Sequence, residues 1–220
     1  MISKVLRYFA VAFLTGGLVA GAHAATITFT PAQGTQADGD SVDADRSILG
    51  NMTDGDTTTI YSLGIGGELT ASIAPEIIKR ASVLELTFGN NASFPESMQI
   101  YLGTDSTGTL LGEIFNEASG ISSTSANGAV ISAFANTPIK GVTSFLIGLG
   151  TNVGSALTFV DTTASNFAVS GDKDGFDIAE LSITPVPIPA AGFLFLSGLF
   201  GAGLWRRRKI QKEVGLPAHT

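Results

Sequence analysis

The side chains that could do chemistry in the middle of this 220-residue chain are mostly carboxylates. The chain has no cysteine, and its two histidines, His23 and His219, lie near the two ends. Ser-His or Cys-His activation of a nucleophile and thiolate metal sites are therefore excluded between residues 25 and 184. What remains is acid–base chemistry by paired carboxylates, as in glycosidases, or oxygen ligation of a hard cation.

The net charge of this middle segment limits its partners. Residues 25–184 contain eighteen Asp and Glu and five Lys and Arg, a net charge of −13, whereas the whole chain carries −7. Such a field repels nucleic acid and anionic lipid and raises the local concentration of cations. We therefore expect no nucleic-acid partner.

Two acidic stretches have residue types that suit a cation. The first is NMTDGDTTT (residues 51–59), in which a glycine separates Asp54 from Asp56, and the second is GFDIAELSI (residues 175–183). Ca²⁺ prefers about six to eight hard oxygen ligands, and a tight glycine turn lets several of them converge. The alternative is an Asp-Gly turn whose carboxylates are merely solvated.

These two stretches resemble the D-G-D/N-x-x-T loop and the closing strand of galactose-binding-like (discoidin-like) β-sandwiches. The resemblance implies a structural Ca²⁺ and, for the fold, an association with carbohydrate or matrix. The implied ligands are side-chain or backbone oxygens of Asp54, Asp56 and Thr59, backbone carbonyls of Asn51 and Ala179, and the carboxylate of Glu180.

The elements that must position these loops are short β-strands. Hydrophobic residues alternate in TITFT (26–30), SVLELTF (82–88) and SMQIYLG (97–103), and Asp-Gly, Gly-Gly and Asn-Gly turn signals recur between such segments. The continuous apolar run FLIGLG (145–150) predicts a strand buried on both faces, and PEIIKRAS (75–82) is interpreted as a single helical turn. The pattern predicts an all-β jelly roll or β-sandwich of about eight strands.

The N-terminus has the three parts of a secretory signal peptide. Basic residues precede an apolar run over residues 8–20, and Ala22-His23-Ala24 has the small-x-small pattern of a cleavage site. We expect residues 1–24 to be removed and the mature chain to start at Ala25. The alternative is a short membrane anchor.

The C-terminal region predicts a membrane-spanning helix. Residues 189–205 are 17 positions without a charge, and a helix of that length spans roughly 25 Å. The cluster Arg206, Arg207, Arg208 and Lys209 follows and is expected to stop transfer and to stay in the cytoplasm together with residues 210–220.

The order of a VPIPA segment, an apolar helix and a basic cluster resembles the VPLPA-type PEP-CTERM sorting signals. The resemblance covers about residues 186–209, and its motif is Val186, Pro187, Ile188, Pro189 and Ala190. It implies a Gram-negative envelope protein that is processed by an exosortase, an integral-membrane cysteine peptidase, and a link to extracellular polysaccharide and biofilm. Two departures are Ile188 in place of the usual leucine and the eleven residues after Lys209.

The sequence therefore predicts four parts: a signal peptide (1–24), a β-sandwich (25–184), a sorting signal with a transmembrane helix (185–209) and a cytoplasmic tail (210–220). The sandwich is expected to face the periplasm from the inner membrane and to reach the surface after processing. The function interpreted from this is a non-enzymatic binding or structural module associated with exopolysaccharide. The alternatives are a secreted carboxylate-based glycan hydrolase and a purely structural adhesin. Tyr61 and Tyr101 are the only tyrosines in the sandwich that could stack on a sugar, and Tyr101 is expected to be exposed.

Overall fold

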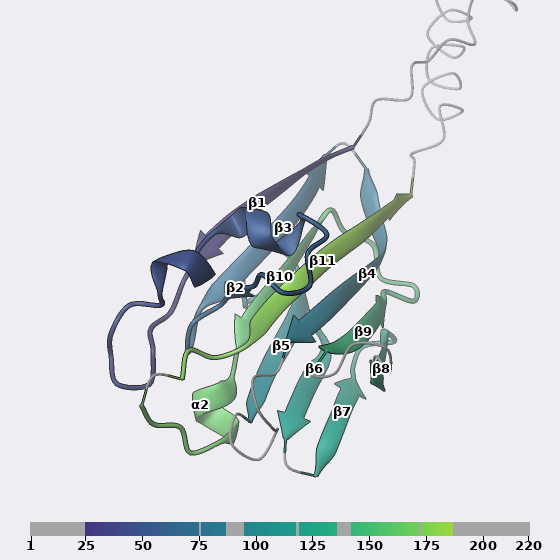
Figure 1. Ribbon diagram of the computed structural model, residues 1–220. Helices are drawn as coiled ribbons and strands as arrows, with labels where there is room; N and C mark the ends of the chain where they lie inside the picture. The colour runs from purple at the N-terminus through teal and green to yellow at the C-terminus, as the bar shows by residue number, and fades with distance from the viewer. Residues whose placement is uncertain are drawn as a thin grey trace, which may run out of the picture. The chain divides into compact units, whose positions relative to one another are not determined.

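Two antiparallel β-sheets make up the part of the chain that the computed structural model describes, which is residues 25–74, 76–86, 95–117, 119–135, 142–171 and 173–186 (Figure 1). These residues all belong to one compact unit, Ala25–Pro187. The predicted signal peptide lies outside the described residues, as do the apolar segment and the basic cluster of the predicted sorting signal. No helix within the described ranges combines the length and hydropathy of a membrane span.

The six-stranded sheet has the order β1-β3-β10-β5-β6-β7. Its strands are β1 (Thr26–Ala32), β3 (Glu68–Ala74), β10 (Ala156–Asp161), β5 (Glu96–Leu102), β6 (Thr109–Glu117) and β7 (Gly120–Ser125).

The five-stranded sheet has the order β2-β11-β4-β9-β8. Its strands are β2 (Tyr61–Ser62), β11 (Asp177–Val186), β4 (Ile77–Leu86), β9 (Val142–Gly148) and β8 (Val130–Ala135). Two short 3-10 helices, η1 (Ala44–Arg46) and η2 (Leu49–Met52), lie between β1 and β2, and the short helix α2 (Thr163–Asn166) follows β10.

The strand register explains where the core lies. In the five-stranded sheet, Ile183, Ala81, Ile147 and Ile131 are cross-strand neighbours and all four are buried. The inward residues of the other sheet, such as Ile100 and Phe159, are also buried, because successive residues of a strand alternate between its two faces. The predicted all-β sandwich is therefore confirmed.

Two local expectations and the strand count differ from the structure. The segment PEIIKRAS is not a helical turn: β4 begins at Ile77 and pairs with both β11 and β9. The run FLIGLG is not buried on both faces, because Leu146 is 41% exposed on the outer side of β9. The described residues contain eleven strands instead of about eight, since elements such as the two-residue β2 and the polar β7 have no hydrophobic alternation to reveal them.

The sandwich is closed at the edge where β7 and β8 meet. The backbone N–H of Ile131 donates to Ser125 Oγ at 2.9 Å, and the hydroxyl of Ser123 donates to the Ile131 carbonyl at 3.1 Å. These serines of β7 therefore form hydrogen bonds with backbone groups of β8 that would otherwise be unpaired at a sheet edge.

Candidate binding site

The predicted ligand residues lie on two elements that pack against each other. Asn51 is in η2, and the loop with Asp54, Asp56 and Thr59 leads from η2 into β2. Helix η2 packs against β11, the strand that carries Ala179 and Glu180, and β2 pairs with β11 at its start. The fold therefore brings the loop and the last strand into one region, although they are far apart in the sequence.

Within the loop, each carboxylate is occupied by a local hydrogen bond. Asp54 accepts from the backbone N–H of Asp56 at 2.8 Å and from the hydroxyl of Thr59 at 2.8 Å. Asp56 accepts from the backbone N–H of Thr58 at 2.9 Å and from its hydroxyl at 2.6 Å. The two hydrogen bonds from Thr58 lower the pKa of Asp56, so this exposed side chain is ionised at neutral pH.

A second turn elsewhere in the chain repeats the arrangement of Asp56. Asp105 accepts from the backbone N–H of Thr107 at 2.8 Å and from its hydroxyl at 2.5 Å, and these bonds lower its pKa in the same way. The hydrogen bonds of the Asp56 loop are therefore those of an Asp-x-Thr turn. Asp105 is a matched reference for any metal test at Asp56.

The strand side of the predicted site contains an irregularity at Ala179. The register of β11 against β4 shifts between Ile178 and Glu180, so Ala179 is the extra residue of a β-bulge. A bulge takes one residue out of the ladder, which suits a backbone carbonyl that serves as a ligand. All the predicted ligands are oxygens, as Ca²⁺ prefers. Over the described residues, no group of three or more His, Cys, Asp or Glu side chains is arranged to hold a metal ion.

A pocket of about 430 Å³ opens beside this loop. It is lined by Asp45, Arg46, Asn51, Thr58, Thr59 and Ile60. The Asn51 amide is held in place because it donates to the carbonyls of Asp45 (2.8 Å) and Ile60 (2.6 Å). The pocket thus combines a carboxylate, a guanidinium, an amide and two hydroxyls with one apolar side chain.

Arg46 is fixed by two buried carboxylates, and sequence reasoning did not single it out. Its guanidinium forms ion pairs with Asp174, at 2.6 Å, and with Asp177. The side chains of Asp174 and Asp177 are only 5% and 1% exposed, whereas that of Arg46 is 21% exposed. A local signal was present, because Arg46 is one of only five basic residues between residues 25 and 184.

Further carboxylates are buried between the two sheets. Burial raises the pKa of Glu96 well above its ordinary value, and the negative charges of Asp177 and Glu85 raise it further. Burial also raises the pKa of Asp177 well above normal, against the opposing effect of Arg46. The side chain of Asn116 donates to Glu85 at 2.7 Å. Burial therefore favours the protonated form of Glu96 and, against the effect of Arg46, of Asp177, and it makes both unsuited to contact a polymer at the surface.

The two tyrosines differ in exposure. Tyr61 is 1% exposed and belongs to the core, so it offers no stacking surface. Tyr101 is half-buried on the outer side of β5, less open than expected, and its hydroxyl donates to Gln99 at 2.6 Å. On the neighbouring strand, Glu113 accepts from Thr162 at 3.0 Å and from Asn166 at 2.9 Å. This polar face is occupied largely by its own hydrogen bonds.

The sorting-motif residues lie at the end of the described chain. Val186 is the last residue of β11 and pairs with Ile77 of β4, so the VPIPA segment starts where the last strand ends. The remaining predicted residues of the sorting motif, the stop-transfer cluster and the cleavage site lie outside the described residues; they are Pro187, Ile188, Pro189, Ala190, Arg206–Lys209, Ala22 and Ala24.

No family model matches the chain, and no curated protein matches it. Among solved structures, a pectin-binding carbohydrate-binding module is similar at 10% identity and a TM-score of 0.42, covering 74% of this chain and 94% of its own. A family 32 carbohydrate-binding module from C. perfringens NanJ in complex with galactose has 14% identity and a TM-score of 0.39, with 71% and 92% covered. The CBM32 of AlyQ in complex with 4,5-unsaturated mannuronic acid has 15% identity and a TM-score of 0.39, with 74% and 98% covered. At this level of similarity, the ligand of a matched structure does not identify a ligand for this chain.

Proposed function

We propose that the sandwich is a non-enzymatic module that binds a neutral saccharide in the pocket beside η2. The observation that carries the proposal is the composition of the pocket lining around Asp45, Arg46 and Asn51. Sugar hydroxyls both donate and accept hydrogen bonds, and the lining offers a guanidinium donor on Arg46 and acceptor oxygens on the carboxylate, amide and hydroxyl side chains. The amide N–H groups of Asn51 and the hydroxyl protons of Thr58 and Thr59 are already bonded within the protein, so these side chains can only accept. A pocket of about 430 Å³ lies within the size range of small-ligand sites.

The rigidity of the lining supports the same proposal. Arg46 is held by Asp174 and Asp177, and Asn51 is held by two backbone carbonyls. Groups that are already fixed lose little entropy when a ligand binds. The six lining residues include no aromatic side chain, so stacking adds nothing, and we expect a dissociation constant in roughly the millimolar range, about −4 kcal/mol.

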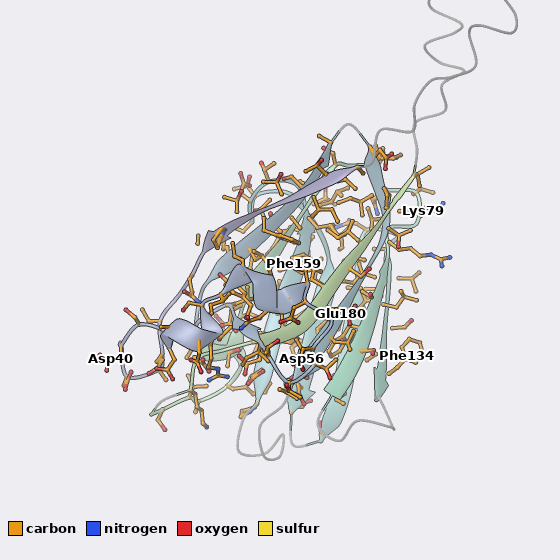
Figure 2. The ribbon with its side chains drawn as sticks, turned by 45° about the horizontal axis from the view of Figure 1, so that its top comes forward. Asp40, Asp56, Lys79, Phe134, Phe159 and Glu180 are labelled. Atoms are coloured by element: carbon orange, nitrogen blue, oxygen red, sulfur yellow. The ribbon has the colours of Figure 1, made fainter. Side chains whose placement is uncertain are left out.

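Isothermal titration of residues 25–187 with fragments of the exopolysaccharide of the producing cell tests this proposal. Asp45→Ala and Thr58→Ala should each weaken binding about tenfold, a loss of about 1.4 kcal/mol. Asp40→Ala, an exposed acid in a different loop (Figure 2), is the matched control and should bind like the wild type. Unchanged affinity in Asp45→Ala would contradict the pocket assignment. Mass spectrometry of the glycan after incubation should find it intact, whereas shortened products would favour the hydrolase.

We further propose that the Asp54 loop and the β11 bulge bind one structural Ca²⁺. The support is the all-oxygen donor set and the unpaired position at Ala179. Binding would require Asp54 and Asp56 to exchange turn hydrogen bonds for the metal. A ligand at a hundred times its dissociation constant stabilises by about 2.7 kcal/mol, which corresponds to roughly 5–10 °C in melting temperature for a domain of this size.

Thermal unfolding in EDTA and in millimolar Ca²⁺ tests the metal proposal. Asp56→Ala and Glu180→Ala should abolish the Ca²⁺-dependent increase in melting temperature. Asp105→Ala, which removes the same turn bonds from an equivalent turn, should keep it. Identical wild-type curves in the two buffers would favour the simple Asp-Gly turn.

We also propose that the module is exported, held at the inner membrane by its C-terminal helix, and released by an exosortase-type peptidase near the VPIPA segment. The support is the order of signal peptide, VPIPA segment, apolar run and basic cluster in the sequence. Mass spectrometry of the mature protein should find Ala25 at one end and a C-terminus near residues 186–190. A full-length chain in cells with an active exosortase would contradict the processing step.

A further inference from the structure

The outer face of the five-stranded sheet is an ordered grid of residues that do not contribute to the core. Its first row is Thr184, Arg80, Gly148 and Val130, on β11, β4, β9 and β8 in turn. The middle row is Ser182, Ser82, Leu146 and Ser132. The third row is Glu180, Leu84, Ser144 and Phe134. All twelve residues are exposed or half-buried, whereas the alternating rows between them form the core.

A continuous apolar strip crosses this outer face along β8 and β9. Val130 is 61% exposed, Phe134 is 55% exposed and Leu146 is 41% exposed. Leu146 lies diagonally between the other two, because Val130 pairs with Gly148 and Phe134 pairs with Ser144. Figure 2 shows Phe134 at the outer side of the sheet, away from the rest of the sandwich. Strands β8 and β9 contain no charged residue.

The open surface is the face of the sheet rather than the edge of β8. At the edge, the backbone groups of Ile131 are already bonded to Ser123 and Ser125, which opposes the addition of a further strand at that point. An exposed apolar strip with a polar surround is typical of a protein–protein contact. Aliphatic side chains such as Val130 and Leu146 suit another apolar surface better than the ring face of a sugar.

We propose that this outer face binds the same face of a second copy of the chain. The arrangement is a face-to-face pair with a twofold axis along the middle row. In that arrangement Leu146 lies opposite Leu146 of the second copy, and Val130 lies opposite its Phe134. The contact is isologous and therefore closes as a dimer.

The charges on the face complement one another in this arrangement. Arg80 is in the first row on β4, and Glu180 is in the third row on β11. The twofold rotation superimposes the first row of one copy on the third row of the other, which places Arg80 one strand away from Glu180 of the second copy. Strands are about 4.8 Å apart, so these long side chains are within reach of each other. The domain carries a net charge of −13, and this face, with one cation and one anion, adds no net charge to the contact.

The size of the face sets the expected affinity. Four strands about 4.8 Å apart and three rows about 7 Å apart give a face of roughly 19 by 20 Å. That is smaller than the approximately 800 Å² per partner of a standard stable interface. The dimer should therefore be weak and depend on protein concentration, and it should be favoured where many copies share one membrane.

Sedimentation velocity of residues 25–187 in EDTA over about 10–500 µM tests the proposal, and EDTA removes any metal from Glu180. The wild type should shift from monomer towards dimer with concentration, and Leu146→Asp and Phe134→Ser should stay monomeric. Val153→Asp places the same charge at a 68% exposed valine outside the face and should behave like the wild type. A monomeric wild type at all concentrations would overturn the proposal. If Phe134→Ser then weakened glycan binding, the occupant of the strip would be a polysaccharide.

The absence of cysteine permits a second test on the full-length chain in membranes. Leu146→Cys and Val153→Cys each introduce the only thiol of the molecule. Facing sheets lie about 10 Å apart, too far for a direct disulfide, so a short bis-maleimide is the suitable reagent. Cross-linked dimer should form at least several-fold faster from Leu146→Cys than from Val153→Cys. Equal rates in the two variants would contradict the arrangement whether or not the charged variants fold.

Discussion

Replacing Arg46 with methionine should destabilise the sandwich far more than its place in a surface pocket suggests. The guanidinium pairs with Asp174 and Asp177, whose side chains are 5% and 1% exposed. Methionine keeps an apolar stem of similar length but leaves both carboxylates buried without this cation. Removing one partner of a buried ion pair costs about 3–5 kcal/mol. Because Arg46 is itself 21% exposed, we expect a value near the lower end of that range.

The assay is thermal and urea unfolding of residues 25–187 in EDTA at pH 7. A loss of about 3 kcal/mol corresponds to a decrease of roughly 6–12 °C in melting temperature. The matched control is Arg80→Met, the same substitution at an exposed arginine of β4, which should change the free energy of unfolding by no more than about 0.5 kcal/mol. Adding Asp174→Asn and Asp177→Asn to Arg46→Met should recover much of the lost stability, because the unpaired charges are then removed.

The pH dependence gives an independent check on the same reasoning. Burial raises the pKa of Asp177 in the folded state, and Arg46 opposes that increase. Without Arg46 the pKa rises further, so lowering the pH protonates Asp177 and stabilises the variant. The difference in stability between wild type and Arg46→Met should therefore shrink from pH 7 to pH 5. A difference that is constant over this range, or a variant as mild as Arg80→Met, would refute the electrostatic explanation.

Three further substitutions test other parts of the fold. Glu96→Gln should raise the free energy of unfolding at pH 7 by about 1 kcal/mol or more and should have less effect at pH 5. Burial raises the pKa of Glu96, so the wild type gains stability as Glu96 is protonated on acidification. Urea unfolding at the two pH values measures this, and an equal gain at both would contradict it. Asp161→Ala should lower the free energy of unfolding by about 3 kcal/mol, since the buried carboxylate of Asp161 accepts from the backbone N–H groups of Gly66 and Phe176 and from the hydroxyl of Thr163. Asp105→Ala, in an exposed turn, should lower it by less than about 1 kcal/mol. Gly67→Ala should also cost about 3 kcal/mol or more, because an added Cβ would lie 1.9 Å from the Leu63 carbonyl oxygen, whereas Gly50→Ala, where the nearest atom is 3.8 Å away, should be nearly neutral in thermal unfolding.

The fold class was predictable from the sequence because alternation is a local property. Ile100 and its neighbours in SMQIYLG alternate with polar residues, and the structure buries Met98 and Ile100 as this pattern requires. The failures occurred where the local pattern is ambiguous. Leu146 lies in a continuous apolar run, which predicts burial of both faces of its strand. The run gives no information about the position of β9, which is next to the edge strand β8 and has an exposed outer face.

The pocket could not be predicted because its key residue is defined by distant partners. Arg46 precedes Asp174 and Asp177 by more than 120 residues, and the two segments meet only in the folded chain, where β2 pairs with β11 and η2 packs against it. Arg46 directly follows an acidic stretch whose carboxylates Asp38, Asp40, Asp43 and Asp45 are all exposed. The residue of this region that fixes the pocket is Arg46, which follows the stretch.

The metal question shows most clearly where sequence reasoning stops. Asp56 and Asp105 have the same local chemistry, since each is followed two residues later by a threonine that donates two hydrogen bonds to it. Nothing in either turn alone distinguishes a metal ligand from a solvated acid. The difference lies in what surrounds them: the Asp56 loop follows a helix that packs on β11, the strand that carries the Ala179 bulge, whereas Asp105 lies in the hairpin between β5 and β6. A Ca²⁺ effect that depends on Asp56 and not on Asp105 would therefore come from what surrounds the first turn, which is Asp54 in the same loop and β11, against which η2 packs.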